Sequence, residues 1–150
     1  MPPVFESEYF EIAVPPHPHV CRSDGGHLII HPKAAVEDRT KLTRDQAVEL
    51  VKLTMVAGEA MKTVLTQRGI DLGGINYQDN GNWRHELHVH LYGRARSATI
   101  QPYGHALAFP PTREAFMKEM GDLEPLNEGD IAALKSEIER LLATEKYREF

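Results

Sequence analysis

The segment from His85 to Arg96 alternates apolar and polar side chains, and this alternation limits the possible folds more than any other part of the sequence. Successive side chains of a β-strand point to opposite faces of its sheet. One face of this strand is therefore predicted to be apolar and buried, with Leu87, Val89, Leu91 and Ala95. The other face carries acidic, titratable and cationic groups, namely Glu86, His88, His90, Tyr92, Arg94 and Arg96. Such a face predicts a surface that binds anions and has acid–base capacity.

Further strands are predicted from runs of aromatic and β-branched residues that end at prolines, glycines or polar turns. One strand-like run extends from Val4 to Val14, a second from His27 to His31, and a third from Gly73 to Gln78. The first two runs are expected to pair in an antiparallel manner, with a long connection between them.

A long helix is predicted from Thr43 to about Arg68, because apolar residues there recur at steps of three and four. Thr43 is a suitable N-cap for this helix, and Gly69 is suited to end it. A shorter helix is predicted from Thr112 to Met120, and a C-terminal helix begins at Asn127 or Asp130. Few helices and several strands predict an α+β domain built on an antiparallel sheet.

Composition limits the possible partners and the number of domains. The chain has 150 residues, of which 41% are hydrophobic, so one domain over residues 1–150 is expected. A net charge of -5 disfavours long nucleic acid and anionic membranes as partners. No apolar stretch approaches the ~20 residues of a membrane helix. Cys21 is the single cysteine, and the N-terminus lacks a secretory pattern, so a cytoplasmic location is expected.

Two interpretations of the polar strand face do not involve nucleophilic catalysis. The first is an ordinary solvated strand face. The second is a metal site in which Glu86, His88 and His90 are the ligands. A further ligand would be His85, brought in by a bulge, or a distant histidine such as His17, His19 or His105. No second cluster with metal-ligand spacing supports the metal interpretation, so no resident metal is expected.

Several segments together resemble the histidine triad (HIT) family. The run His88-Val89-His90-Leu91-Tyr92 resembles the latter part of the family motif His-x-His-x-His-x-x. The segment Gly26 to Lys33 is similar to the Gly-His and Pro-Lys segment that precedes the long helix of the family. Asn76 and the loop Asp79–Asn82 resemble the polar strand and loop before the triad. The resemblance covers roughly positions 5 to 100, so residues 1–100 are expected to form a HIT core and residues 101–150 an extension with a helix.

The resemblance implies a HIT-like sheet with one long central helix, and it implies a nucleotide hydrolase or nucleotidyl transferase. His88 would be the nucleophile that forms a covalent nucleotidyl-histidine, and His90 would be the third triad histidine. An attacking imidazole must be neutral, with its other nitrogen held by an acceptor. The expected substrate-binding residues are Asn76, Asn82, Trp83 and Arg94. A homodimer and a small nucleotide ligand are also implied.

The first triad position is where this sequence departs from the family, because strand parity places Glu86 there. Three arrangements follow. Glu86 orients His90 or holds Mg²⁺ on the nucleotide phosphates; a bulge at Glu86-Leu87 turns His85 onto the active face; or the protein binds nucleotide without hydrolysing it. No cofactor is expected to be required, although Mg²⁺ can accompany the nucleotide. The candidate catalytic set is therefore His88, His90, Glu86 and His85.

Overall fold

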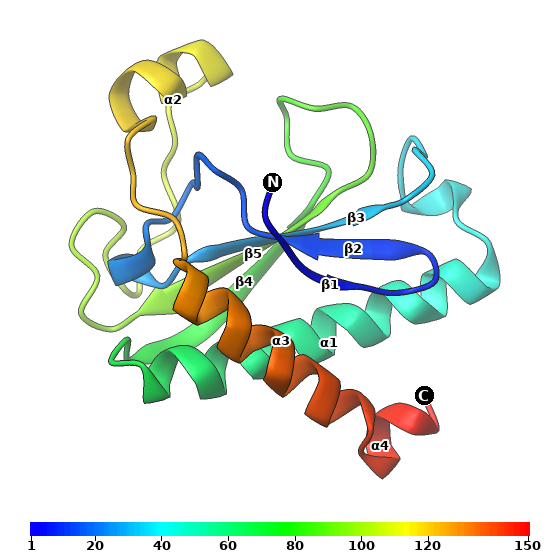
Figure 1. The fold of residues 1–150 in the computed structure, drawn as a ribbon. Helices are drawn as coiled ribbons and strands as arrows, with labels where there is room; N and C mark the ends of the chain where they lie inside the picture. Colours follow the sequence, from blue (N-terminus) through cyan, green and yellow to red (C-terminus); the bar gives the residue numbers. More distant parts are fainter.

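A five-stranded antiparallel sheet forms the centre of the protein, which a computed structural model describes over residues 1–150 (Figure 1). The strands are β1 (Pro3–Glu6), β2 (Phe10–Ala13), β3 (His27–Pro32), β4 (Leu72–Asp79) and β5 (Val89–Ala95). Their order in the sheet is β1-β2-β3-β5-β4, so β5 lies between β3 and the edge strand β4. This position makes the histidine-bearing strand a central one.

Helices cover the two faces of the sheet unequally (Figure 1). The long helix α1 and the C-terminal helix α3 lie along one face, whereas α2 and the loop between β4 and β5 rise on the other. The helices are α1 (Arg44–Gln67), α2 (Arg113–Met120), α3 (Glu128–Leu142) and the short α4 (Glu145–Arg148), with two 3-10 turns at Arg22–Asp24 and Arg39–Lys41. No helix is both long and apolar enough to span a membrane.

Helix α1 begins and ends where its sequence predicts. The Thr43 side chain accepts a hydrogen bond from the Gln46 backbone N–H, and the Gln46 side chain accepts one from the Thr43 N–H. This capping box satisfies two of the free N–H groups at the helix start. After the helix, Gly69 has a φ of 96°, a conformation that L side chains rarely adopt.

The hydrophobic core lies between the sheet and helices α1 and α3. The apolar face predicted for residues 87–95 enters it as expected, with Leu87, Val89, Leu91 and Ala95 all buried. Helix α3 contributes Leu134, Ile138 and Leu141 to the same cluster. The predicted α+β class with an antiparallel sheet, a long helix and a C-terminal helix is confirmed.

Three details differ from the sequence-based prediction. The run from Val4 to Val14 is a hairpin of two strands, because the chain turns back between Glu6 and Phe10. Strand β5 begins at Val89, so residues 84–88 are loop rather than strand. The C-terminal turn α4 was not predicted, and its Tyr147 is buried against the core.

The segment after β5 is held by a buried carboxylate. Asp24 is 2% exposed, and its oxygens accept hydrogen bonds from the backbone N–H groups of Thr99, Ile100 and Gln101 at 2.7 to 2.9 Å. The Gln101 side chain then exchanges two hydrogen bonds with the backbone of Ala108. These hydrogen bonds position the loop from 99 to 108 and therefore the residues 109–113 that follow it.

Candidate functional site

A cavity of about 620 Å³ opens on the face of the sheet opposite α1. Strands β3 and β5, the β4–β5 loop and the segment before α2 all contribute to its lining. The lining residues are Met1, Pro16, His19, Ile29, Gln78, Gly81, Asn82, Trp83, Arg84, His88, His90, Tyr92, Phe109, Pro110, Pro111 and Arg113. This set contains three histidines and two arginines but no aspartate or glutamate. The cavity therefore has a local charge opposite to that of the whole chain, which suits an anionic ligand.

His88 sits in the cavity with one ring nitrogen already engaged. Its Nδ1 lies 2.7 Å from the main-chain carbonyl oxygen of Glu86. A carbonyl oxygen only accepts hydrogen bonds, so Nδ1 carries the proton. In the neutral ring the lone pair is then on Nε2. Burial lowers the pKa of His88 most, and the Arg84 guanidinium lowers it further, which favours this neutral form.

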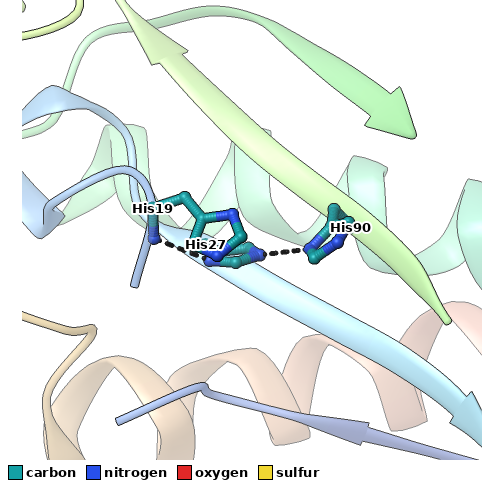
Figure 2. Close-up of side chains that lie close together, drawn as sticks. All are labelled: His19, His27 and His90. Atoms are coloured by element: carbon teal, nitrogen blue, oxygen red, sulfur yellow. Dashed lines mark hydrogen bonds between the residues drawn. The ribbon is translucent and has the colours of Figure 1, made fainter. Parts of the chain in front are cut away.

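His90 is oriented by a chain of hydrogen bonds through two other histidines (Figure 2). The His19 backbone N–H donates to Nδ1 of His27 at 3.0 Å, so the His27 proton is on Nε2. That Nε2 lies 2.9 Å from Nδ1 of His90 and donates to it. Neutral His90 consequently carries its own proton on Nε2.

The free nitrogens of His88 and His90 converge beneath Gly81. A Cβ added at Gly81 would lie 2.9 Å from His90 Nε2 and 3.4 Å from His88 Nε2. The Nε2 of His88 carries a free lone pair, and the Nε2 of His90 carries an N–H donor. The cavity thus presents a nucleophilic atom and a hydrogen-bond donor to the same small volume, which is the pairing needed to attack a group and to stabilise charge on it.

Burial keeps the histidine chain neutral. It lowers the pKa of His19 to about 4, with a further contribution from the nearby Arg113 guanidinium. It lowers the pKa of His90 to about 3 and holds the pKa of the fully buried His27 well below its usual range. Each imidazole therefore keeps one donor and one acceptor near neutral pH, and the direction of every hydrogen bond in the chain is preserved.

The structure brings His88, His90, Asn82 and Trp83 to the cavity. The side chains of His85 and Glu86, the two candidates for the first triad position, do not line it. The side chain of His85 is 83% exposed and lies 3.8 Å from a Glu37 oxygen. The Glu86 side chain is 56% exposed and lies 3.8 Å from Arg84 Nε. Glu86 contacts the site through its main-chain carbonyl alone.

Two expected substrate-binding residues lie elsewhere. Arg94 is buried, and its guanidinium donates to Asn76 Oδ1 at 2.7 Å and to the carbonyl oxygens of Pro102 and His105. Asn76 and Arg94 line a second, shallower hollow rather than the histidine cavity. Their bonds hold the 102–105 turn against β4 and β5, which is a structural task.

Several residues of the cavity were not among those expected to bind substrate. His19, considered only as a distant metal ligand, has its ring within 4.7 to 5.3 Å of the rings of His27, His90, Trp83 and Phe109. His17, two positions earlier, is exposed and lies against the Gly121 carbonyl. The walls come from residues 109–113, for which the sequence carried no motif signal.

The histidine chain does not fit a metal ion without losing its present bonds. His19, His27 and His90 each offer a ring nitrogen, and these three atoms lie within 4.8 Å of one another. Both nitrogens of His27 are already used, however, one as acceptor and one as donor. Coordination through its Nε2 would require an imidazolate, because the Nδ1 partner is a backbone N–H that cannot accept a proton. The other predicted ligand set is not brought together, since the Glu86 side chain is exposed and does not line the cavity that contains His88 and His90.

The sheet topology and the cavity define an α+β protein with a site built from neutral histidines and two arginines. Residues 4–97 match the family model described as the HIT domain, which spans more than half of the chain. The protein therefore belongs to the histidine triad family, as its sequence pattern predicted. Proteins of this family bind small nucleotide ligands.

Solved structures agree on the fold. A histidine triad protein from Sinorhizobium meliloti has a TM-score of 0.63 at 20% identity, covering 93% of this chain and 87% of that one. A hypothetical histidine triad nucleotide-binding protein from Sulfolobus tokodaii has a TM-score of 0.61 at 18% identity, covering 93% and 85%. A zinc-bound histidine triad family protein from Mycobacterium smegmatis has a TM-score of 0.61 at 17% identity, covering 93% and 84%. A search of curated proteins gave no match.

Proposed function

We propose that this protein is a nucleotide hydrolase or nucleotidyl transferase that acts through a covalent intermediate on His88. The observation that carries the proposal is the 2.7 Å contact between His88 Nδ1 and the Glu86 carbonyl, which leaves the Nε2 lone pair free in the cavity. The similarity of the fold to a uridylyltransferase, with a TM-score of 0.52 at 18% identity, agrees with this class. That comparison covers 92% of this chain and 41% of the uridylyltransferase.

In the first step, the Nε2 lone pair of His88 attacks the α-phosphorus of a nucleotide. A P–N bond forms, and the P–O bond to the leaving group breaks with its electron pair on the departing oxygen. The ring then holds an Nε2–P bond and an Nδ1–H bond and is cationic. The Glu86 main-chain carbonyl accepts a stronger hydrogen bond from this cation than from the neutral ring. Because this contact uses the main chain, a glutamate side chain can replace histidine at the first triad position.

His90 and the loop around Gly81 stabilise the charge on the phosphoryl oxygens. The Nε2–H of His90 donates to a non-bridging oxygen, and the Asn82 amide lies in the same cavity wall. In the second step, water or another acceptor attacks the phosphorus, the P–N bond breaks, and its electron pair returns to His88 Nε2. The acceptor's proton leaves with the product or solvent, which regenerates neutral His88.

A trapping experiment tests the proposal. The protein is mixed with a dinucleoside polyphosphate that carries ³²P at the α-position, and the reaction is quenched in alkali. Alkali is used because the P–N bond of a nucleotidyl-histidine is more stable there than in acid. Label is expected on the wild type and on His85→Ala, and it is expected to be absent from His88→Ala. Steady-state turnover should fall on the order of 10⁴-fold in His88→Ala, because the nucleophile is gone.

A binding protein without catalysis is the second candidate, and the same samples distinguish it. Calorimetric binding of the nucleotide without trapped label or turnover would contradict the proposal and support that alternative. Equal turnover in excess chelator would separately exclude a required Mg²⁺ on the nucleotide.

The homodimer and the cytoplasmic location stay predictions. Large apolar side chains on the outer surface of α1 and on the edge strand β4 support the dimer, namely Val48, Val51, Met55 and Tyr77. Met61 and Leu65 of the same helix are buried in the core and are not available to such an interface.

A further inference from the structure

Two guanidinium groups flank the histidine cavity, and neither belongs to the histidine motif. Arg84 lies on the β4–β5 loop, and its positive charge lowers the pKa of both His88 and His90. Arg113 is the first residue of α2, and its charge lowers the pKa of His19. Arg113 lies beyond residue 97, where the match to the family model ends.

An aromatic contact holds the two arginine-bearing segments together. Trp83, next to Arg84, has its ring 5.3 Å from the ring of Phe116 in α2, and its Nε1 lies 3.5 Å from the Pro111 carbonyl oxygen. His19 packs between them, at 5.3 Å from Trp83 and 4.9 Å from Phe116. The β4–β5 loop and the start of α2 therefore form one continuous rim around the cavity.

Neither arginine has a carboxylate partner inside the cavity. Arg84 forms an ion pair with Glu86 at 3.8 Å, but the Glu86 side chain is 56% exposed and does not line the cavity. Arg113 pairs with no carboxylate, and the cavity lining contains none. A single α-phosphate between His88 and His90 would not need two further cations. The charge at the rim is better matched to a ligand with several phosphates.

We propose that Arg113, together with Arg84, binds the phosphates of the leaving group, so that the protein prefers nucleotides with a polyphosphate leaving group over those with an uncharged one. This inference rests on the proposed function and names its substrate class. Arg113 is a specificity-determining residue that the C-terminal segment adds to the site. The leaving group would depart from the α-phosphorus toward the rim between the two guanidiniums.

The preference is tested with two substrates that share one nucleobase: a dinucleoside tetraphosphate and the 4-nitrophenyl ester of the nucleoside monophosphate. The measured quantity is the ratio of kcat/KM for the tetraphosphate to kcat/KM for the ester. Arg113→Met is expected to lower this ratio roughly tenfold or more, the effect of losing one charge-assisted contact. Lys118→Met, an exposed substitution on the same helix, should leave the ratio unchanged, and Arg113→Lys should restore part of it.

Binding of inorganic tripolyphosphate gives a readout that needs no turnover. Calorimetry at 50 and 200 mM salt should show weaker binding in Arg113→Met than in Lys118→Met, with a smaller salt dependence. An unchanged substrate ratio together with unchanged tripolyphosphate binding would overturn the inference. Absence of turnover of both substrates in the wild type would instead contradict the proposed function, while the tripolyphosphate result would still decide the role of Arg113.

Discussion

Residues 4–97 and residues 98–150 meet at one cavity but contribute different groups to it. The first segment supplies His19, His88 and His90, and the second supplies Phe109, Pro110, Pro111 and Arg113. The histidines lie on or beside the central strands β3 and β5, where neighbouring strands fix their positions. The second segment reaches the cavity as a loop that depends on Asp24 and Gln101 for its path. We infer that the reaction chemistry lies in the family segment and the choice of substrate in the C-terminal one.

After the loss of His88, the largest effect is expected from another change within the first segment. His90→Gln should reduce kcat on the order of 10²- to 10³-fold, because the N–H donor to the phosphoryl oxygens loses its fixed position. His85→Gln is the matched control from the adjacent loop and should stay within about twofold, as expected for an exposed side chain. Steady-state kinetics on both substrates measures this. Comparable losses of kcat in the two variants would show that His85 acts in the site alongside His90.

The second prediction concerns the neutral histidine chain. In the folded protein the pKa values of His19 and His90 lie below those of histidines in the unfolded polypeptide. Unfolding therefore takes up protons once the pH falls below about 6.5. The free energy of unfolding should therefore be highest above that pH. Between pH 6.5 and 4.5 each such histidine should remove up to about 1.4 kcal/mol per pH unit.

Urea unfolding of the wild type and of His19→Gln at pH 7.5, 6.5, 5.5 and 4.5 checks this prediction. The variant should lose stability less steeply below pH 6.5, with a difference approaching about 2.7 kcal/mol over two pH units. A parallel fall in both proteins would show that the pKa of His19 is the same in the folded and the unfolded protein.

The third prediction tests the anchor of the second segment. Asp24→Asn replaces a carboxylate that accepts three backbone N–H bonds with an amide that has a single acceptor oxygen. A loss of about 2 kcal/mol in the free energy of unfolding is expected. The KM of the tetraphosphate should rise more than kcat falls, because the rim rather than the histidines is displaced. A fall in kcat with unchanged KM would contradict the division between the two segments.

The smallest effect is expected at Gly81, where the cavity leaves little space above the two histidines. Gly81→Ala adds a methyl group 2.9 Å from His90 Nε2 and should lower kcat/KM for both substrates about tenfold by occupying the position of a phosphoryl oxygen. Gly74→Ala is the control, because its Cβ would enter open space. Equal activity of the two variants would show that substrate does not bind beneath Gly81.

Much of the fold was predictable because it depends on short-range periodicity. The alternation from Leu87 to Ala95 put the apolar side chains in the core and His88 and His90 on the opposite face. The spacing of apolar residues and the Thr43 cap defined α1 nearly to the residue. The hairpin within residues 4–14 was missed, because a turn of ordinary polar residues carries no strong signal.

The histidine chain and the rim of the cavity could not be predicted in this way. His27 meets His90 across 63 residues, and His19 meets Tyr92 across 73, so both contacts depend on the pairing of β3 with β5. A sequence pattern likewise cannot tell that Glu86 uses its carbonyl while its carboxylate faces solvent.

The sequence by itself determined the fold class, the family and the two histidines that share a strand face, because each is encoded by residues close together in the chain. Only the tertiary structure decided which ring nitrogens carry protons, which histidines support His90, and that Arg113 joins the site. The physical reason is that hydrogen-bond direction and local charge depend on groups brought together by strand pairing and loop anchoring, and these contacts leave no periodic trace in the sequence.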